Sequence, residues 1–200
     1  STLLGSTEFH CGGIDDRFAH RLKQDALRLE LDCPLEDSAM RLLWDSYVEE
    51  RRERNTIMFK ARQLFAANAS ITLVDTPSPH RSLRNMSRGI SLADVPCVCF
   101  PAVFCEEAVL QTQDILRALN AFSVGRSGII CCVTKLDLFP EGREEAFEAA
   151  CRRFSALLSS VGFRSGHRSL LPSVEMRDRL YTLFLCLTRL GIFLPRDVKQ

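Results

Sequence analysis

The sequence predicts an α/β fold in which a mainly parallel sheet is covered by helices. Short apolar segments rich in β-branched residues, 71–74 and 128–133, are typical of buried strands. Residues 106–122 and 143–161 repeat apolar side chains at helical spacing. Strands that alternate with helices of this length favour parallel pairing, because the helix returns the chain to the same edge of the sheet.

Composition is that of a single globular domain. Of the 200 residues, 46% are hydrophobic, which is enough to bury a sizeable core. The formal net charge of +1 gives no bulk attraction to nucleic acid or lipid, so we expect neither direct DNA binding nor membrane association. No apolar segment reaches the ~18 residues of a membrane span. No secretory signal precedes Ser1, and because the chain begins with Ser rather than Met we expect its natural start to be missing.

The nine cysteines do not have the spacing of a disulfide framework. Five of them, at positions 97, 99, 105, 131 and 132, lie in apolar segments, where a thiol behaves as a small hydrophobic group. A Cys-x-x-Cys pair does not occur, so a zinc site is not expected. This usage of cysteine fits a reducing compartment, and we therefore expect a cytoplasmic protein.

The first quarter of the chain is expected to be helical. Ser and Thr precede apolar residues at positions 1–5, which indicates the first turn of a helix. Further helices are predicted over 18–31 and 40–48 from the spacing of apolar residues. The mixed charges of residues 49–54 are typical of a solvated helix end crossed by ion pairs.

Strands are predicted next. Residues 56–65 form a predicted strand, and a short turn joins it to the strand at 71–74, so the two should pair antiparallel as a hairpin. A short irregular helix is expected over 81–89. Residues 95–104 are apolar but contain two prolines, and we expect a strand in only part of this segment.

The second half continues the alternation. The helix at 106–122 has acidic residues in its first turn, which suits the helix dipole, and the helix at 143–161 should stop at Gly162. A last short strand is expected at 169–171. Residues 180–194 fit a helix that is apolar nearly all round, which requires burial or a partner.

An acidic residue, Asp75, stands at the carboxyl end of the strand at 71–74. Ligands of open α/β sheets bind at this end of the strands. A carboxylate in this position can hold Mg²⁺ through water, because Mg²⁺ prefers oxygen ligands and gives up its water reluctantly. The alternative is a plain strand-to-turn junction, which is the more common role of such a residue taken alone.

A second polar sequence, Thr134-Lys135-Leu136-Asp137, follows the strand at 128–133. Its carboxylate could accept hydrogen bonds from N1–H and N2–H₂ of guanine, which adenine cannot offer. The aliphatic part of Lys135 could lie along the purine. The alternative for this tetrapeptide is an ordinary surface turn.

The order of these motifs is that of a guanine-nucleotide switch, and the chain resembles the GTPase domain of the elongation factor 1-alpha group, which includes the eukaryotic termination and ribosome-rescue GTPases. The resemblance covers about six-sevenths of the chain. The segments that carry it are Ser-Thr-Leu-Leu-Gly (1–5), Cys-Gly-Gly-Ile-Asp (11–15) with Arg17, Glu50-Arg51 through Thr56-Ile57, Asp75-Thr76-Pro77, Asn85-Met86 with Gly89 and Ala93-Asp94, Gln111-Thr112, and Val133 to Asp137.

The resemblance implies a P-loop NTPase-like fold, of which the first strand and most of the P-loop are missing here, and binding of GTP or GDP with Mg²⁺. By position, the hydroxyls of Ser1 and Thr56 would coordinate Mg²⁺, and Asp75 would hold it through water. Thr134, Lys135 and Asp137 would recognise guanine. The complete set of implied GTP-binding residues is Ser1, Thr2, Asp75, Thr76, Pro77, Ser78, Thr134, Lys135, Asp137 and Ser173.

By the same resemblance, residues 1–175 would form a translation-factor-type G domain, incomplete at its start, and residues 176–200 an apolar helical tail unlike the family. The parent protein would hydrolyse GTP to GDP and so control tRNA delivery or ribosome engagement in protein biosynthesis. Its implied partners are guanine nucleotide, the ribosome, and tRNA or a release or rescue factor, in the cytoplasm.

Several positions depart from the family pattern. The second switch of the family reads Asp-x-Pro-Gly-His; here Ser78 and Pro79 replace Gly and His, and His80, the candidate catalytic residue, lies one position late. Because proline has no side-chain hydrogen-bonding group, we expect slow hydrolysis. The glycines and lysine that clamp phosphate in the family do not precede Ser1, so we expect the 200-residue chain by itself to bind GTP poorly or not at all.

Two functional hypotheses follow. The chain is either a divergent, incomplete G domain of a translational GTPase, or a GTPase-like pseudoenzyme that acts as a protein- or ribosome-interaction module without hydrolysis. The ordered motifs favour the first, and Ser78-Pro79 together with the apolar tail favours the second. A third possibility is that the tail comes from an alternative reading of the gene and has no function.

Overall fold

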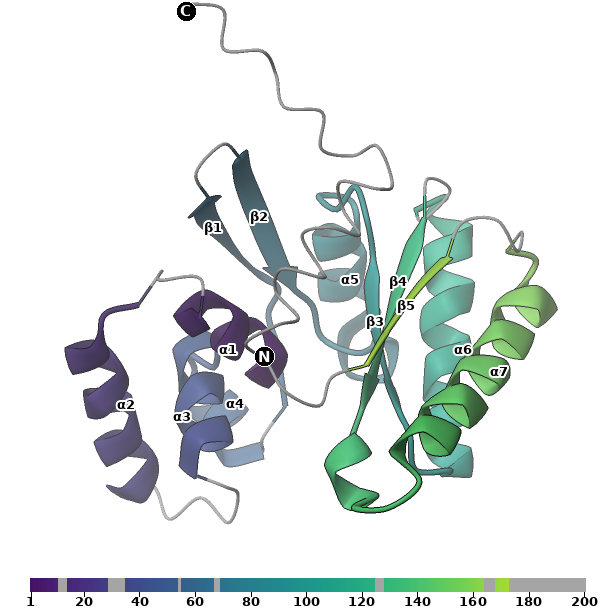
Figure 1. The fold of residues 1–200 in the computed structure, drawn as a ribbon. Coiled ribbons are helices and arrows are strands. Elements are labelled where there is room, and N and C mark those ends of the chain that lie inside the picture. The colour runs from purple at the N-terminus through teal and green to yellow at the C-terminus, as the bar shows by residue number, and fades with distance from the viewer. Residues whose placement is uncertain are drawn as a thin grey trace, which may run out of the picture. The chain divides into compact units, whose positions relative to one another are not determined.

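The computed structural model describes residues 1–10, 14–28, 35–53, 55–66, 69–124, 128–163 and 168–172. These residues belong to two compact units, which comprise residues 1–77 (unit 1) and the described residues from 78 onward (unit 2). Each unit is described by itself below, with the helices and strands labelled as in Figure 1. Within the described residues, every helix is too short or too polar to cross a membrane.

Unit 1 begins with four helices: α1 (Thr2–His10), α2 (Asp16–Arg28), α3 (Leu35–Trp44) and α4 (Val48–Glu53). The central helix is α3, which packs against both α1 and α2. Gly5 permits the close approach of α1, because a Cβ atom at this position would lie only 2.0 Å from the carbonyl oxygen of Met40. The core of this unit contains Leu22 and the fully buried Trp44.

A β-hairpin completes unit 1 (Figure 1). Strand β1 (Lys60–Ala66) pairs antiparallel with β2 (Ala69–Asp75), in a register that places Lys60 opposite Asp75. The structure therefore confirms the predicted hairpin, although β1 starts four residues later than the predicted 56–65 segment. The residues omitted from the strand form the connection from α4, which contributes to the site described below.

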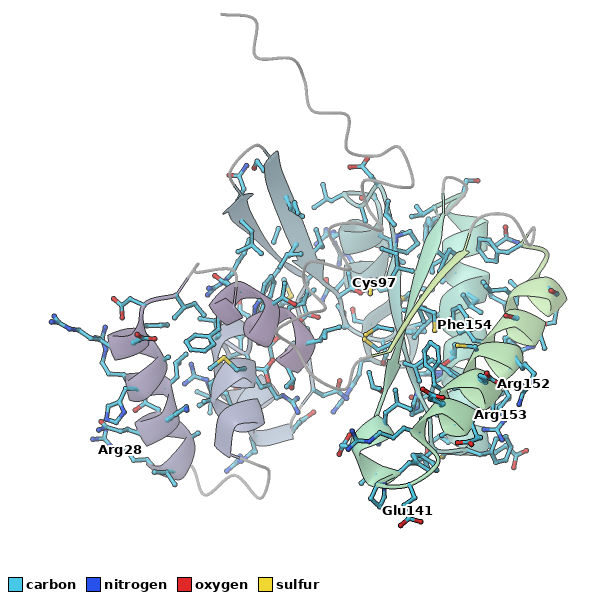
Figure 2. All side chains as sticks on the ribbon, viewed as in Figure 1. Arg28, Cys97, Glu141, Arg152, Arg153 and Phe154 are labelled. Atoms are coloured by element: carbon cyan, nitrogen blue, oxygen red, sulfur yellow. The ribbon has the colours of Figure 1, made fainter. Side chains whose placement is uncertain are left out.

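Unit 2 contains a parallel sheet in the order β3 (Cys97–Pro101), β4 (Ile129–Thr134) and β5 (Arg168–Pro172). Three α-helices accompany the sheet, and they are α5 (Pro79–Ile90), α6 (Glu106–Ala121) and α7 (Arg143–Val161). All three contribute to one hydrophobic core. Phe154 of α7, labelled in Figure 2, is completely buried in this core. Its ring centroid lies 5.7 Å from that of Phe100 on β3.

Unit 2 confirms the alternation of strands and helices that the sequence predicts. Helix α7 ends where predicted, since Gly162 has a φ of 94°, a left-handed conformation that glycine adopts without strain. Helix α5 is irregular, as predicted, because Ser82 has non-helical backbone angles. Among the described cysteines, Cys131 and Cys132 on β4 are buried, Cys151 on α7 is half-buried, and Cys97, Cys99 and Cys105 are exposed.

Two expectations need correction. The described strands form two sheets, because β1 and β2 pair only with each other and the parallel sheet consists of β3–β5. The charged segment 49–54 is not solvated throughout, since Glu50 is completely buried and hydrogen-bonded. The predicted tail helix at 180–194 lies outside the described residues, as does Ser173.

Candidate functional site

Three oxygen-bearing side chains of unit 1 converge from separate segments. Ser1 Oγ donates a hydrogen bond to Asp75 Oδ2 at 2.6 Å and lies 2.9 Å from Thr56 Oγ1. Thr56 Oγ1 donates to the same carboxylate oxygen at 3.4 Å. Thr56 and Asp75 are only 9% and 8% exposed. The structure therefore brings together the three residues to which the resemblance assigns Mg²⁺.

The local structure explains how these side chains are placed. Ser1 precedes α1, and its carbonyl accepts the first helical hydrogen bond, from Gly5 N at 2.9 Å. Asp75 is the last residue of β2, so the hairpin fixes its position. Thr56 lies between α4 and β1, outside helix and strand. The position of Thr56 therefore depends on what holds this connection.

Glu50 of α4 holds the connection. Its Oε1 accepts hydrogen bonds from the backbone N–H groups of Ile57 at 2.9 Å and Met58 at 3.2 Å. Its Oε2 accepts from Tyr47 N at 3.2 Å and from Lys60 Nζ. Burial by itself raises the pKa of Glu50, but the hydrogen bonds from Lys60 and the three backbone groups outweigh burial and lower the pKa. The carboxylate is therefore held in its ionised form.

A polar pocket of about 240 Å³ lies beside this cluster, lined by Ser1, Thr2, Arg41, Asn55 and Thr56. Arg41 Nε on α3 donates at 2.6 Å to Oδ2 of the buried Asp45, which directly follows the helix. The first backbone N–H groups of a helix lack internal partners and attract anions, and α1 begins at Thr2. Hydroxyls, a guanidinium and a helix start are together suited to phosphate oxygens.

The oxygen cluster fits Mg²⁺ in the chemistry of its donors. Two hydroxyls and one carboxylate are hard ligands of the kind that Mg²⁺ prefers. Among the described residues, no group of three or more His, Cys, Asp and Glu side chains could hold a metal ion on its own. Phosphate oxygens and water would therefore complete the coordination shell, as is usual for Mg²⁺ bound with a nucleotide.

The predicted guanine-recognition residues lie in unit 2, at the carboxyl end of β4. Thr134 is the last residue of the strand, and its carbonyl accepts a hydrogen bond from Ala102 N at 2.8 Å. Lys135 has left-handed backbone angles, φ 60° and ψ 30°, which turn the chain sharply out of the sheet. Leu136 is buried and anchors the turn, whereas Lys135 and Asp137 are exposed. The turn therefore presents both charged side chains at the end where ligands of parallel sheets bind.

The second-switch residues divide between the units. Thr76 and the fully buried Pro77 follow β2 in unit 1. In unit 2, Ser78 is the N-cap residue of α5, and Pro79 occupies a first helical position, where its missing N–H costs nothing. His80 Nε2 lies 3.2 Å from Asp114 Oδ2 on α6, and Asp114 also accepts from Arg117 at 3.0 Å. The imidazole is thus paired with a neighbouring helix.

Two residues that shape the site in unit 1 were not assigned a role from the sequence. Glu50 lies in a mixed charge segment, where no spacing distinguishes the one buried acid from its exposed neighbours. Arg41 could have been found, because it interrupts the apolar residues at 40–44 and has an acid four positions later. Such a charge within an apolar stretch has to find a partner or a ligand.

Comparison with known proteins places these features in a family. The family described as "Elongation factor Tu GTP binding domain" matches residues 1–186. Elongation factor 1-alpha of Xenopus laevis is 28% identical over 178 residues, which are 86% of this chain but 37% of that protein. The chain thus spans little more than a third of the length of this relative.

Two solved structures share the fold. The Ski7 GTPase-like domain of S. cerevisiae bound to GDP and inorganic phosphate has a TM-score of 0.70 at 16% sequence identity. The same domain bound to GTP has a TM-score of 0.63 at 15% identity. The matches cover 99% of this chain and 48% and 49% of those chains. At this level of identity they establish the α/β GTPase-domain-like fold alone.

Proposed function

Because the chain belongs to the elongation factor Tu GTP-binding domain family, we propose, in place of the weak or absent binding expected from the sequence, that it binds GTP and GDP together with Mg²⁺ as the G domain of a translation-type GTPase. The observation that supports this best is the convergence of Ser1, Thr56 and Asp75, from a helix start, a loop and a strand end. Three segments so distant in sequence supply the hydroxyls and the carboxylate in the order that the family uses.

In this function, the hydroxyls of Ser1 and Thr56 would bind the metal directly and Asp75 would hold it through water. When bound, Mg²⁺ neutralises negative charge on the phosphate oxygens. Thr2 and the start of α1 would face the phosphates. The exposed carboxylate of Asp137 would accept from guanine N1–H and N2–H₂, with the stem of Lys135 against the ring.

We further propose that hydrolysis is slow, so that the chain acts mainly as a nucleotide-binding module. Fast hydrolysis needs a side chain that orients the attacking water. His80 is the candidate, but its Nε2 is engaged with Asp114 and Pro79 fills the preceding position. By resemblance to the family, we also propose that the parent protein acts in protein synthesis in the cytoplasm. Its partners would be the ribosome and tRNA or a rescue factor.

Fluorescent guanine nucleotide binding tests the proposal. We would measure affinity with Mg²⁺ for the wild-type protein and for Asp137→Asn. Loss of a charge-assisted pair of hydrogen bonds should weaken binding by roughly ten- to a hundredfold. Glu141→Gln is a matched control, because Glu141 is another exposed acid that follows the same turn (Figure 2) and should leave affinity unchanged.

The same titration with an adenine nucleotide is the specificity control. Equal affinity for adenine and guanine nucleotides, or an unchanged affinity in Asp137→Asn, would contradict a guanine site at the end of β4. If guanine nucleotide binds as proposed, phosphate release from GTP in a single turnover distinguishes a slow GTPase from a module that only binds.

A further inference from the structure

Glu50 differs from every charged neighbour on its helix. Helix α4 reads Val-Glu-Glu-Arg-Arg-Glu, and in it Glu49, Arg52 and Glu53 are exposed. The Glu50 side chain is 0% exposed. A buried carboxylate is stable only where hydrogen-bond donors reach both of its oxygens. The donors around Glu50 therefore explain why it can be buried.

The donors come from three parts of unit 1. Tyr47, whose N–H is one donor, directly precedes α4, and Lys60, whose Nζ is another, is the first residue of β1. The N–H groups of Ile57 and Met58 come from the two residues directly after Thr56. Lys60 Nζ also donates to the carbonyl of Trp44, and it lies 5.5 Å from the centre of the Tyr47 ring. The segment 55–58 is thus joined to a buried carboxylate that is ionised and paired with Lys60.

We propose that Glu50 is a positioning residue that holds Thr56 Oγ1 beside Ser1 and Asp75 before any nucleotide binds. The proposal rests on the function proposed above, which gives Thr56 its metal-binding role. If the segment moved away, the ionised Glu50 would be left in the core without two of its donors, so the open arrangement is disfavoured.

A loop held in place by Glu50 would change how the site is regulated. In switches whose loop is ordered by the terminal phosphate, the loop is ordered with GTP and released after hydrolysis. A loop that Glu50 holds closed would gain little further order from the terminal phosphate, because a ligand shifts a conformational equilibrium only by its differential affinity for the two states. Segment 55–58 should therefore have the same conformation with GTP, with GDP and without nucleotide.

Hydrogen exchange of the Ile57 and Met58 amides in the nucleotide-free protein tests the closed state. Both amides should exchange at least tenfold more slowly than those of exposed loops, and Mg²⁺ with GTP should change their rates less than threefold. In Glu50→Gln both should exchange at least tenfold faster, whereas Glu49→Gln, the exposed neighbour, should leave them unchanged. The amides of α3, in the same unit, are the internal reference for unfolding of unit 1.

Fast exchange of Ile57 and Met58 in the free wild-type protein, or a tenfold slowing on addition of GTP, would overturn the proposal. If Glu50→Gln fails to fold, the comparison of the wild type with and without GTP still decides whether segment 55–58 is closed before nucleotide binds. If the wild type binds no guanine nucleotide, the proposed function fails, and exchange in the free protein then shows separately whether Glu50 holds the loop.

A double-mutant cycle separates positioning from general stability. Affinity for Mg²⁺ with GTP would be measured for Glu50→Gln, Thr56→Ala and the double variant. Glu50→Gln should weaken binding about tenfold in the wild-type background and less than twofold in the Thr56→Ala background, because it acts through Thr56. Equal effects in both backgrounds would show that Glu50 has only a structural role.

Discussion

At the scale of single residues, the ionised state of Glu50 predicts a specific pH dependence of stability. Its folded pKa lies below the ordinary value of 4.5, because hydrogen bonds from Lys60 and the backbone outweigh burial. Between the two pKa values the unfolded chain binds more protons than the folded chain, so the contribution to stability is complete above the ordinary value and is lost as pH falls through the folded pKa.

We expect this contribution to disappear in Glu50→Gln. The difference in unfolding free energy between wild type and variant should be constant above about pH 5.5, and it should shrink below pH 4.5 with a slope of at most about 1.4 kcal/mol per pH unit. Urea unfolding followed by the fluorescence of Trp44, the single tryptophan, measures it. A difference that does not vary with pH would show that Glu50 ionises alike in the folded and unfolded chain.

The residues of the oxygen cluster and Glu50 differ in how far the sequence revealed them. Ser1, Thr56 and Asp75 were found because their order along the chain resembles a family, and the structure places their oxygens within 3.4 Å of one another. Glu50 stands in a segment that carries the resemblance but was assigned no role, because burial of one acid among six charged residues depends on donors that only the folded chain brings together.

At the scale of elements, helix α5 determines what His80 can do. Pro79 begins the helix, and the next residue binds Asp114 on α6. We therefore expect His80→Ala to change the single-turnover rate of GTP hydrolysis by less than twofold, because an imidazole held by α6 does not orient the attacking water. A loss of tenfold or more, with unchanged GTP affinity, would instead give His80 the catalytic role that the resemblance suggests.

Element boundaries followed the strength of their local signals. Helix α7 was predicted to the residue, because its apolar stripe is long and a glycine in left-handed conformation ends it. Strand β3 occupies only 97–101 of the apolar segment 95–104. It ends at the second proline, because proline has no N–H to donate to the ladder. The pairing of β1 only with β2 could not be read from the sequence, which indicates strands but does not determine how far a sheet extends.

At the scale of the whole molecule, the described chain has two hydrophobic cores. One contains Trp44 and Leu22 in unit 1, and the other contains Phe154 and Phe100 in unit 2. The oxygen cluster belongs to the first unit and the guanine-recognition turn to the second.

Separate cores predict that damage to one unit is local. Phe154→Ala removes a fully buried ring and should destabilise unit 2 by about 3–5 kcal/mol. Exchange of the β4 amides should report this loss, while the urea midpoint from Trp44 fluorescence should remain unchanged. Arg152→Ala is the control, because its side chain is 72% exposed and its loss should cost no more than about 0.5 kcal/mol. If both probes shift together in Phe154→Ala, the two units unfold as one cooperative body, and nucleotide contacts in one would then stabilise the other directly.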